Sequence, residues 1–346
     1  MLKLLNKLHI HIEPSKSECN RHLVFRALAN LSNDALLTSS ADDVKVVKSI
    51  LNNEQGNKWD VGHAGTAFRF LTAYACFQKE PITLTGSERL QERPISELVN
   101  ALTDLGAEII YLDREGYAPL HIIPAQLQSK QLTFNILKSS QFISALMLIA
   151  PFLQDGLVLA LHKDQPSMSY VALTKRVLEE YGVSITQENN TFTVYPYIKQ
   201  TRNTSVKIES DWSSASYWYA LSIVFNTPVT LSYFKEHSSQ GDSALPSIFK
   251  QFGVKTKFDE GGIHIKPYPK AYTDDFEWDC VNCPDIAQTI LVVAFILGVP
   301  CYLKGLSTLA NKECERLLAM QNELKKFGGV LHILNADEVK LEKGTP

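Results

Sequence analysis

The sequence has little net charge and no long hydrophobic run. Its 346 residues include 34 Lys and Arg against 37 Asp and Glu, which gives a formal net charge of −3 at pH 7. Proteins that bind nucleic acid or anionic membranes through their overall charge are strongly basic, so we expect neither partner. The best apolar stretch, Ile290–Leu297, has the length of a core helix and is too short to span a bilayer.

Cysteine is also sparse, with six residues scattered along the chain. The segment Met1–Ile12 is short and interrupted by Lys and His, so it does not resemble a signal peptide, and we expect a cytoplasmic protein with reduced thiols. The pair Cys280 and Cys283 has the spacing of a zinc or redox motif. A zinc site would need a second pair of ligands at usable spacing, so we favour two ordinary thiols and expect no metal.

One short segment concentrates groups that bind anions. Ser15, Lys16, Ser17 and Arg21 follow the apolar run Leu8–Ile12 and precede a segment that reads as a helix from residue 22 to 31. Lysine, arginine, hydroxyls and the N–H groups of a starting helix all suit phosphate or carboxylate oxygens. By itself this string is common on solvated loops, but the rest of the chain repeats the theme.

The chain contains an internal repeat. Amphipathic helices that end in a glycine recur at intervals of roughly 70–75 residues, as expected where glycine forms the left-handed end of a helix before a strand. These glycines are Gly106, Gly182, Gly253 and Gly328. The repeat predicts βαβαββ units, with a shortened further copy at Asp42–Leu51.

A second helix type recurs at the same interval and is apolar almost all round. Its copies are Gly65–Phe77, Ser139–Pro151, Ser213–Val224 and Pro284–Leu297. Helices of this kind belong at the centre of a domain. Several such N-termini brought together would form an anion site without a high net charge.

Basic and hydroxyl-bearing motifs follow one another in a fixed order. They are Ser15-Lys16-Ser17 with Arg21, Gly65-Thr66-Ala67 with Arg69, Thr85-Gly86-Ser87 with Arg93, Ser139-Ser140-Gln141, Ser213-Ser214-Ala215, Gln240-Gly241-Asp242, Pro284-Asp285, and Lys312-Glu313 with Arg316. The series closely resembles the 5-enolpyruvylshikimate-3-phosphate (EPSP) synthase family from about Ile10 to about Leu331.

This resemblance implies an α/β fold, a two-domain inside-out α/β barrel of repeated βαβαββ units with helices packed inside. We expect one domain at residues 17–209, with three units of which the first is shortened, and a second at 1–16 plus 210–346. The resemblance also implies an enzyme of the shikimate pathway. It would transfer the enolpyruvyl group of phosphoenolpyruvate to the 5-hydroxyl of shikimate 3-phosphate and release phosphate, without a metal or organic cofactor.

The resemblance assigns the first group of site residues by motif. Lys16 would lie between the two substrates, with Ser17 and Arg21 on the side of the shikimate phosphate. Gly65 would let the backbone approach phosphoenolpyruvate, and Arg93 would bind its carboxylate or phosphate.

A second group would bind shikimate 3-phosphate. Ser139, Ser140 and Gln141 would hold its phosphate and face phosphoenolpyruvate from the start of a helix. Ser167 and Tyr170 fall where the family has further contacts to the same substrate, on an alignment counted back from the glycine at the helix end.

A third group would carry the chemistry. Asp285 resembles the base for the 5-hydroxyl, and Lys312 with Glu313 resembles the pair that handles the proton. Arg316 would be a second fork-shaped partner for phosphoenolpyruvate. Thr308 stands where the family often has Asn.

Structural explanations compete with these roles. Glu313 and Arg316 have the spacing of a surface ion pair on a helix, Arg93 precedes a proline and could shape a turn, and Asp285 could cap a helix. We favour function for Lys16, Arg93, Asp285 and Lys312. We favour a structural role for Arg69, which lies in an apolar helix.

Three departures from the family pattern remain. Pro14 replaces the usual Gly before Ser-Lys-Ser. His63 replaces the usual Asn before Ala-Gly-Thr, and this histidine would either add a charge or simply replace a turn residue. The sequence stops at Pro346, before the family's Asp-His-Arg-Met helix and a later lysine. We therefore expect the sixth repeat unit to be absent. The sequence would then be either a truncated representation of the enzyme or a remnant that has lost part of its site.

Two other functions stay open at this point. A catalytically impaired homologue would bind shikimate 3-phosphate without turnover. A UDP-N-acetylglucosamine enolpyruvyl transferase shares the fold but has a different first basic motif. Apart from small-molecule substrates we expect no partner, and we expect a monomer.

Overall fold

The computed structural model describes residues 8–32, 39–198, 206–268 and 274–344. The chain divides into two compact units: unit 1 is Met1–Glu13 with Glu209–Pro346, and unit 2 is Pro14–Ile208. Each unit has its own hydrophobic core. Unit 2 begins a few residues before position 17, where the sequence predicts a boundary, because helix α1 starts at Lys16 and packs against other helices of this unit.

Unit 2 contains two four-stranded sheets with strand orders β2-β3-β5-β4 and β6-β7-β9-β8. Their strands are β2 (Lys58–Asp60), β3 (Ile82–Thr85), β4 (Glu108–Tyr111), β5 (Leu120–Ile123), β6 (Gln131–Thr133), β7 (Leu157–Ala160), β8 (Ile185–Glu188) and β9 (Thr191–Val194). In each sheet the first two strands are parallel and the remaining pairs are antiparallel. The aligned residues Trp59, Leu84 and Leu120 are all buried, so one face of the first sheet belongs to the core.

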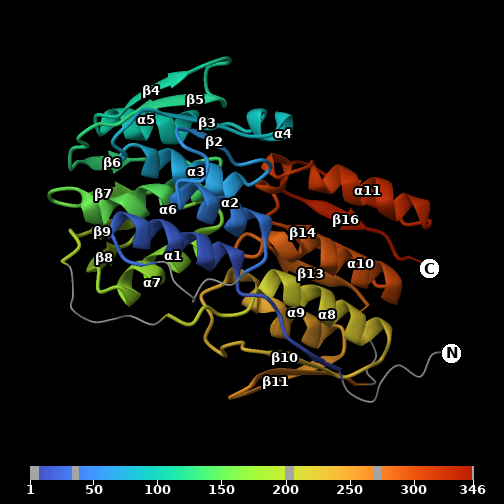
Figure 1. Ribbon diagram of the computed structural model, residues 1–346. Coiled ribbons are helices and arrows are strands. Elements are labelled where there is room, and N and C mark those ends of the chain that lie inside the picture. The colour runs from blue at the N-terminus through green and yellow to red at the C-terminus, as the bar shows by residue number, and fades with distance from the viewer. Residues whose placement is uncertain (1–7, 33–38, 199–205, 269–273, 345–346) are drawn as a thin grey trace. The chain divides into compact units, whose positions relative to one another are not determined.

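The helices of unit 2 pack against one another. They are α1 (Lys16–Leu28), α2 (Asp42–Leu51), α3 (Gly65–Ala75), α4 (Glu88–Gln91), α5 (Ser96–Asp104), α6 (Ser140–Ile149) and α7 (Met168–Glu180), with a 3-10 turn η1 (Ala150–Phe152). Helices α1, α3, α6 and α7 lie side by side (Figure 1). The buried residues of these helices and of the strands form one continuous core.

Unit 1 has the same construction, with strand orders β1-β10-β12-β11 and β13-β14-β16-β15. The strands are β1 (Leu8–Ile10), β10 (Val229–Ser232), β11 (Val254–Asp259), β12 (Gly262–Pro267), β13 (Phe276–Asp279), β14 (Cys301–Lys304), β15 (Leu331–Ile333) and β16 (Val339–Leu341). The helices are α8 (Trp212–Val224), α9 (Leu245–Gln251), α10 (Ala287–Leu297) and α11 (Arg316–Lys326), with 3-10 turns η2 (Gly241–Ala244), η3 (Pro284–Ile286) and η4 (Leu309–Asn311).

The predicted repeat and fold class are confirmed. In three of the four sheets an apolar helix connects the two parallel strands; in the sheet of β1 and β10, all of unit 2 and then the apolar helix α8 lie between them in the chain. In each of the four sheets a second helix leads into the antiparallel hairpin. Each second helix ends at a glycine with a positive φ between 76° and 103°, a conformation that glycine adopts without steric cost. These residues are the predicted Gly106, Gly182, Gly253 and Gly328.

Two expectations about the helices are wrong. The first helix begins at Lys16 and not at residue 22, so Lys16, Ser17 and Arg21 all lie in its first two turns. The apolar helix α8 is not central throughout, since Tyr217, Leu221 and Val224 are exposed.

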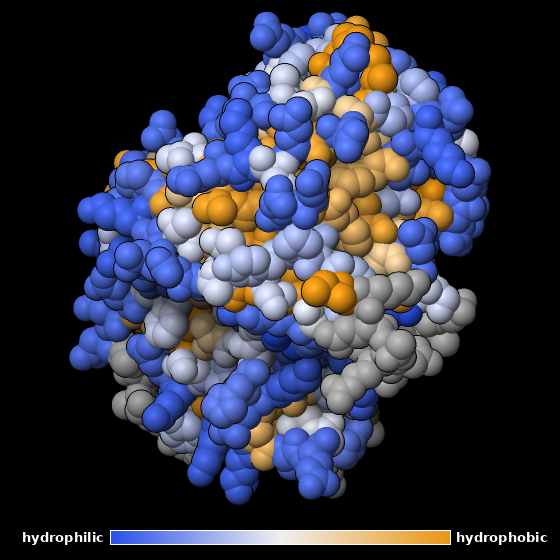
Figure 2. Space-filling view, turned by 90° about the vertical axis from the view of Figure 1, so that its left-hand side faces the viewer, coloured by the Kyte–Doolittle hydropathy of each residue, from blue (hydrophilic) through white to orange (hydrophobic). Residues whose placement is uncertain are grey.

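Figure 2 shows a face on which hydrophobic residues form several patches among hydrophilic ones. In the part of the chain that the structure describes, no helix is both long and apolar enough to cross a membrane. The CxxC thiols are buried, and hydrogen bonding to Cys283 together with burial raises the pKa of Cys280. Within the described ranges no group of three or more His, Cys, Asp or Glu side chains is placed to hold a metal ion.

Candidate active site

Helix α1 starts with a lysine that is paired with an aspartate. Lys16 Nζ lies 2.8 Å from Asp43 Oδ1, and 48% of the lysine side chain is exposed. Asp43 lies in the first turn of α2, where a carboxylate also favours the helix N-terminus. Because the ammonium is half-exposed, an incoming anion can compete with Asp43 for it.

Arg21 lies one turn further on and is buried. Its Nε donates to Thr174 Oγ1 (2.7 Å), Nη1 to the Ser17 carbonyl (2.6 Å), and Nη2 to Ser144 Oγ and the Tyr170 carbonyl (both 3.1 Å). Burial lowers the pKa of Arg21 to about 10, which leaves the guanidinium charged at neutral pH. With 1% of its surface exposed, Arg21 connects α1 to α6 and α7, and its expected contact with substrate stays a prediction.

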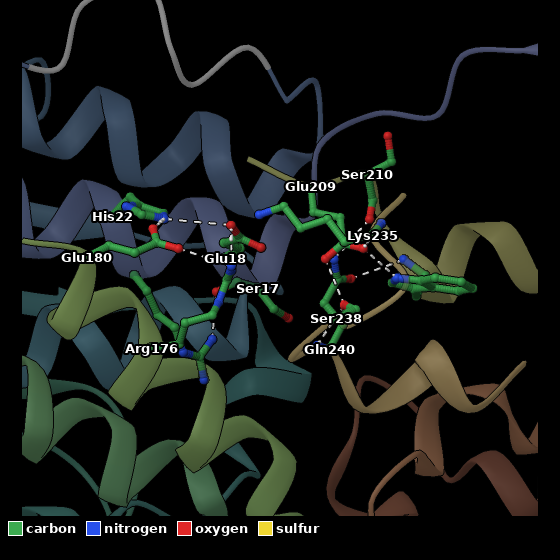
Figure 3. A network of polar contacts seen from close by, with 12 residues as sticks. Ser17, Glu18, His22, Arg176, Glu180, Glu209, Ser210, Lys235, Ser238 and Gln240 are labelled. Atoms are coloured by element: carbon green, nitrogen blue, oxygen red, sulfur yellow. Dashed lines mark hydrogen bonds and ion pairs between the residues drawn. The ribbon is translucent and has the colours of Figure 1, made fainter. Parts of the chain in front are cut away.

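A charged network fixes the start of α1 against α7 (Figure 3). Arg176 Nη2 lies 2.7 Å from Glu18 Oε1, and Arg176 Nη1 lies 3.0 Å from Glu180 Oε1. Burial alone would raise the pKa of Glu18, but His22 and Arg176 outweigh it and lower the value. Glu18 directly follows Ser17, so the network holds the first turn of α1 in one orientation.

The start of α3 is packed beneath an arginine. A Cβ on Gly65 would come within 2.6 Å of Arg93 Cζ, so only glycine lets this guanidinium approach the backbone. Arg69 donates to the Gly65 carbonyl from below (2.9 Å) and is buried between Phe68 and Phe142. This contact supports the structural role expected for Arg69.

The start of α6 lies beside the start of α3. Ser139 caps α6 by accepting a hydrogen bond from the Gln141 backbone N–H (3.3 Å), and Ser140 is buried in the first turn. Gln141 Nε2 donates to Thr66 Oγ1 (3.0 Å), which joins the two helix N-termini. The buried Gln141 Oε1 has no hydrogen-bond partner among the described residues, which leaves an acceptor for a ligand hydroxyl.

Ser167 and Tyr170 lie at the start of α7. Ser167 has a φ of +58°, an uncommon value for a residue other than glycine and one that often marks a functional site. The Tyr170 carbonyl accepts from Arg21, so this helix start is connected to α1. The structure therefore groups the predicted residues of unit 2 around helix N-termini.

Unit 1 contains a compact charged group. Asp285 Oδ1 lies 3.1 Å from Lys312 Nζ and 2.8 Å from Arg316 Nη1, and Arg316 Nη2 lies 3.1 Å from Glu313 Oε2. Burial disfavours the Arg316 charge, but Asp285 and Glu313 outweigh it and raise its pKa. Asp285 lies within η3, and its carboxylate contacts both cations of this charged group. Glu313 and Arg316 are accordingly more than a surface ion pair.

Thr308 precedes η4, close in sequence to Lys312. Its Oγ1 is buried without a hydrogen-bond partner among the described residues. A hydroxyl in this state is available to a ligand, which agrees with the position being one of substrate contact.

Sequence reasoning quoted Asp242 within a motif but gave it no role. Ser213, in the first turn of α8, donates a hydrogen bond to Asp242 Oδ2. Burial first, and then the negative charge of Asp285, raise the pKa of Asp242 to about 8. Two other residues of this kind are Thr66, which was quoted within the Gly65 motif without a role, and Asp43, whose pairing with Lys16 no sequence signal indicates.

A second network, around Glu209 and Gln240, holds the start of α8 (Figure 3). Gln240 Oε1 accepts from the Trp212 backbone N–H (3.1 Å), and its Nε2 donates to the Ser210 carbonyl (2.9 Å). The buried Glu209 accepts from Trp212 Nε1 (2.8 Å) and from the backbone N–H of Lys235 (2.9 Å). The start of α8 is thereby fixed next to η2.

The family described as EPSP synthase (3-phosphoshikimate 1-carboxyvinyltransferase) matches residues 25–345 of this sequence. The chain belongs to the EPSP synthase family. This membership confirms the identification made from the motifs.

Named relatives support this EPSP synthase assignment. A 3-phosphoshikimate 1-carboxyvinyltransferase of Bacteroides fragilis is 38% identical over 349 aligned residues, which cover 98% of this chain and 83% of the relative. A protein of the same name from Methanoregula boonei is 29% identical, covering 94% and 82%. A solved EPSP synthase structure from Acinetobacter baumannii has a TM-score of 0.71 at 20% identity, covering 98% and 82%, which shows the shared fold.

Proposed function

We propose that the chain transfers the enolpyruvyl group of phosphoenolpyruvate to the 5-hydroxyl of shikimate 3-phosphate, with release of phosphate. The observation that carries the proposal is the group Asp285, Lys312, Glu313 and Arg316, in which a carboxylate lies within 3.1 Å of two cations in a member of the EPSP synthase family. Such a group can accept one proton and donate another.

Unit 2 supplies the binding groups in this proposal. The N-termini of α3 and α6 present backbone N–H groups near Gly65 and Ser140, and Lys16 and Arg93 add positive charge. These features suit the phosphates and carboxylate of the two substrates. They also explain how a chain of net charge −3 binds polyanions locally.

Asp285 acts as the base in the addition step. It takes the proton from the 5-hydroxyl while the hydroxyl oxygen forms a bond to C2 of phosphoenolpyruvate. The electron pair of the C2–C3 double bond takes a proton at C3 from the Lys312 and Glu313 pair, which gives a tetrahedral adduct with a methyl group. Arg316 and Lys312 stabilise the negative charge of the groups that accept protons, before and after each proton transfer.

The elimination step reverses the proton transfer at C3. A proton leaves the methyl group, the C2–C3 double bond forms again, and the bond from C2 to the phosphate oxygen breaks. Inorganic phosphate leaves with that electron pair. The atoms and electrons balance without an oxidant, a reductant or a further co-reactant.

Phosphate release by the purified chain tests the proposal. We expect release with shikimate 3-phosphate and phosphoenolpyruvate together, and none with either alone or with UDP-N-acetylglucosamine in place of the shikimate ester. A sample that is thermally stabilised by shikimate 3-phosphate but releases no phosphate would instead be the impaired homologue. The monomeric state and the cytoplasmic location stay predictions, to be tested by gel filtration and cell fractionation.

A further inference from the structure

Asp242 is a buried carboxyl group that the proposed chemistry does not use. It lies in η2, and 4% of its surface is exposed. Oδ2 accepts the hydrogen bond from the Ser213 hydroxyl, whereas Oδ1 has no hydrogen-bond partner among the described residues. An ionised carboxylate with one buried, unsatisfied oxygen is costly, and protonation removes most of that cost.

The charged groups around Asp242 favour the same state. From α8 it is faced by Asp211, which caps the helix by accepting from the Ser214 N–H (2.8 Å). From η3 it is faced by Asp285, and after η4 by Lys312. Lys312 and Arg316 are both within 3.1 Å of Asp285. The carboxylates of Asp211 and Asp285 therefore both approach Asp242. The two cations, Lys312 and Arg316, are both paired with Asp285.

We propose that Asp242 is a positioning residue that stays protonated at neutral pH, so that Lys312 and Arg316 remain on Asp285. A negative charge on Asp242 would draw Lys312 away and make the buried Asp242 and the partly buried Asp285 repel each other. This inference rests on the proposed function for the role of Asp285. The protonation state of Asp242 does not depend on that function. Burial and the negative charge of Asp285 raise the pKa of Asp242 to about 8, which supports a protonated carboxyl at neutral pH.

Folding stability tests the protonation state without any activity. Between about pH 5 and pH 7 the folded chain would hold one proton on Asp242 that the unfolded chain releases, so the contribution of Asp242 disfavours folding as the pH rises. Asp242→Asn keeps the shape and cannot titrate. The wild-type unfolding constant divided by that of Asp242→Asn should therefore rise about tenfold per pH unit and become constant above about pH 8.

A ratio that stays constant from pH 5 to pH 7 would mean an ionised Asp242 and overturn the proposal. Infrared difference spectra of the folded proteins provide a second measurement that requires no unfolding. The wild type minus Asp242→Asn should show the C=O stretch of one protonated carboxyl at pH 6.5 and its loss at pH 9. Absence of that band at pH 6.5 would also contradict the proposal.

The pH profile of phosphate release tests the positioning role. The wild-type kcat should fall as the pH rises through about 8, whereas Asp242→Asn should lack this fall and exceed the wild type at pH 9. Glu277→Gln, at an exposed carboxylate on β13, is the matched control and should follow the wild type. A loss in Asp242→Asn that is equal at all pH values would refute the positioning role. If the wild type releases no phosphate at any pH, the proposed function fails, and the stability ratio still decides the state of Asp242.

Discussion

Helices α6 and α8 have similar sequences and different surroundings. Both follow a polar cap, both have two consecutive serines at or just before their first turn, and neither carries a charged residue. Every residue of α6 except Gln141 is buried, since α3, α7 and α1 pack around it. Helix α8 leaves Tyr217, Leu221 and Val224 exposed. An apolar sequence therefore establishes what a helix can bury, while the number of neighbouring helices determines what it does bury.

The two units also differ in how their site residues balance charge. In unit 2 the buried Arg21 donates hydrogen bonds to hydroxyls and backbone carbonyls and makes no direct ion pair with any residue that the structure describes. In unit 1 Asp285 is in direct contact with Lys312 and Arg316. The first arrangement holds three helices together, whereas the second has the groups that proton transfer requires, because its carboxylate and ammonium can each exchange a proton with a bound molecule.

The largest effect is expected for Asp285→Asn. Removing the base should lower kcat by about a hundredfold to ten-thousandfold, the usual contribution of general base catalysis. The change should leave binding of shikimate 3-phosphate to unit 2 nearly intact, which thermal stabilisation by that ligand would measure. Glu277→Gln on β13 again serves as the control. Loss of binding together with kcat would mean that the two units do not divide binding and chemistry in this way.

A large effect on stability is expected for Leu146→Ala in α6. Leu146 is 0% exposed, and a cavity at such a position costs about 2–5 kcal/mol of unfolding free energy. Urea denaturation followed by fluorescence would measure it. A cost below 1 kcal/mol would show that the core of unit 2 relaxes around the cavity.

A smaller and local effect is expected for Gly65→Ala. The added Cβ would collide with the Arg93 guanidinium and push it from the start of α3, so we expect the KM for phosphoenolpyruvate to rise about tenfold or more, of the order of 1–3 kcal/mol. The KM for shikimate 3-phosphate should change less. Equal changes in both constants would contradict the assignment of Gly65 and Arg93 to phosphoenolpyruvate.

The sequence predicts the repeat well because its signals are local. A glycine such as Gly182 after an amphipathic helix marks a left-handed helix end, and this requirement does not depend on tertiary contacts. The beginning of α1 was less predictable. Ser15 precedes it without forming a side-chain cap, and Lys16, Ser17 and Glu18 read as loop residues until the Arg176 network holds them in a helix.

The site was predictable in composition and unpredictable in pairing. Motif resemblance selects Asp285, Lys312 and Arg316, but no local signal shows that residues 27 to 31 positions apart meet at one oxygen atom. Asp242 was missed for a related reason. An aspartate after glycine reads as a turn residue, and its unusual environment arises only from the burial of η2 against α8 and η3.

The smallest effect is expected for Leu221→Ala in α8, the counterpart of Leu146→Ala. Leu221 is 42% exposed, so truncation removes little buried area, and alanine is a good helix former. We expect a change in unfolding free energy within about 0.5 kcal/mol, measured by the same urea titration. A cost close to that of Leu146→Ala would mean that α8 is covered in solution. Because the two substitutions are chemically identical, the difference between them measures packing alone, and its absence would remove the contrast between the two units.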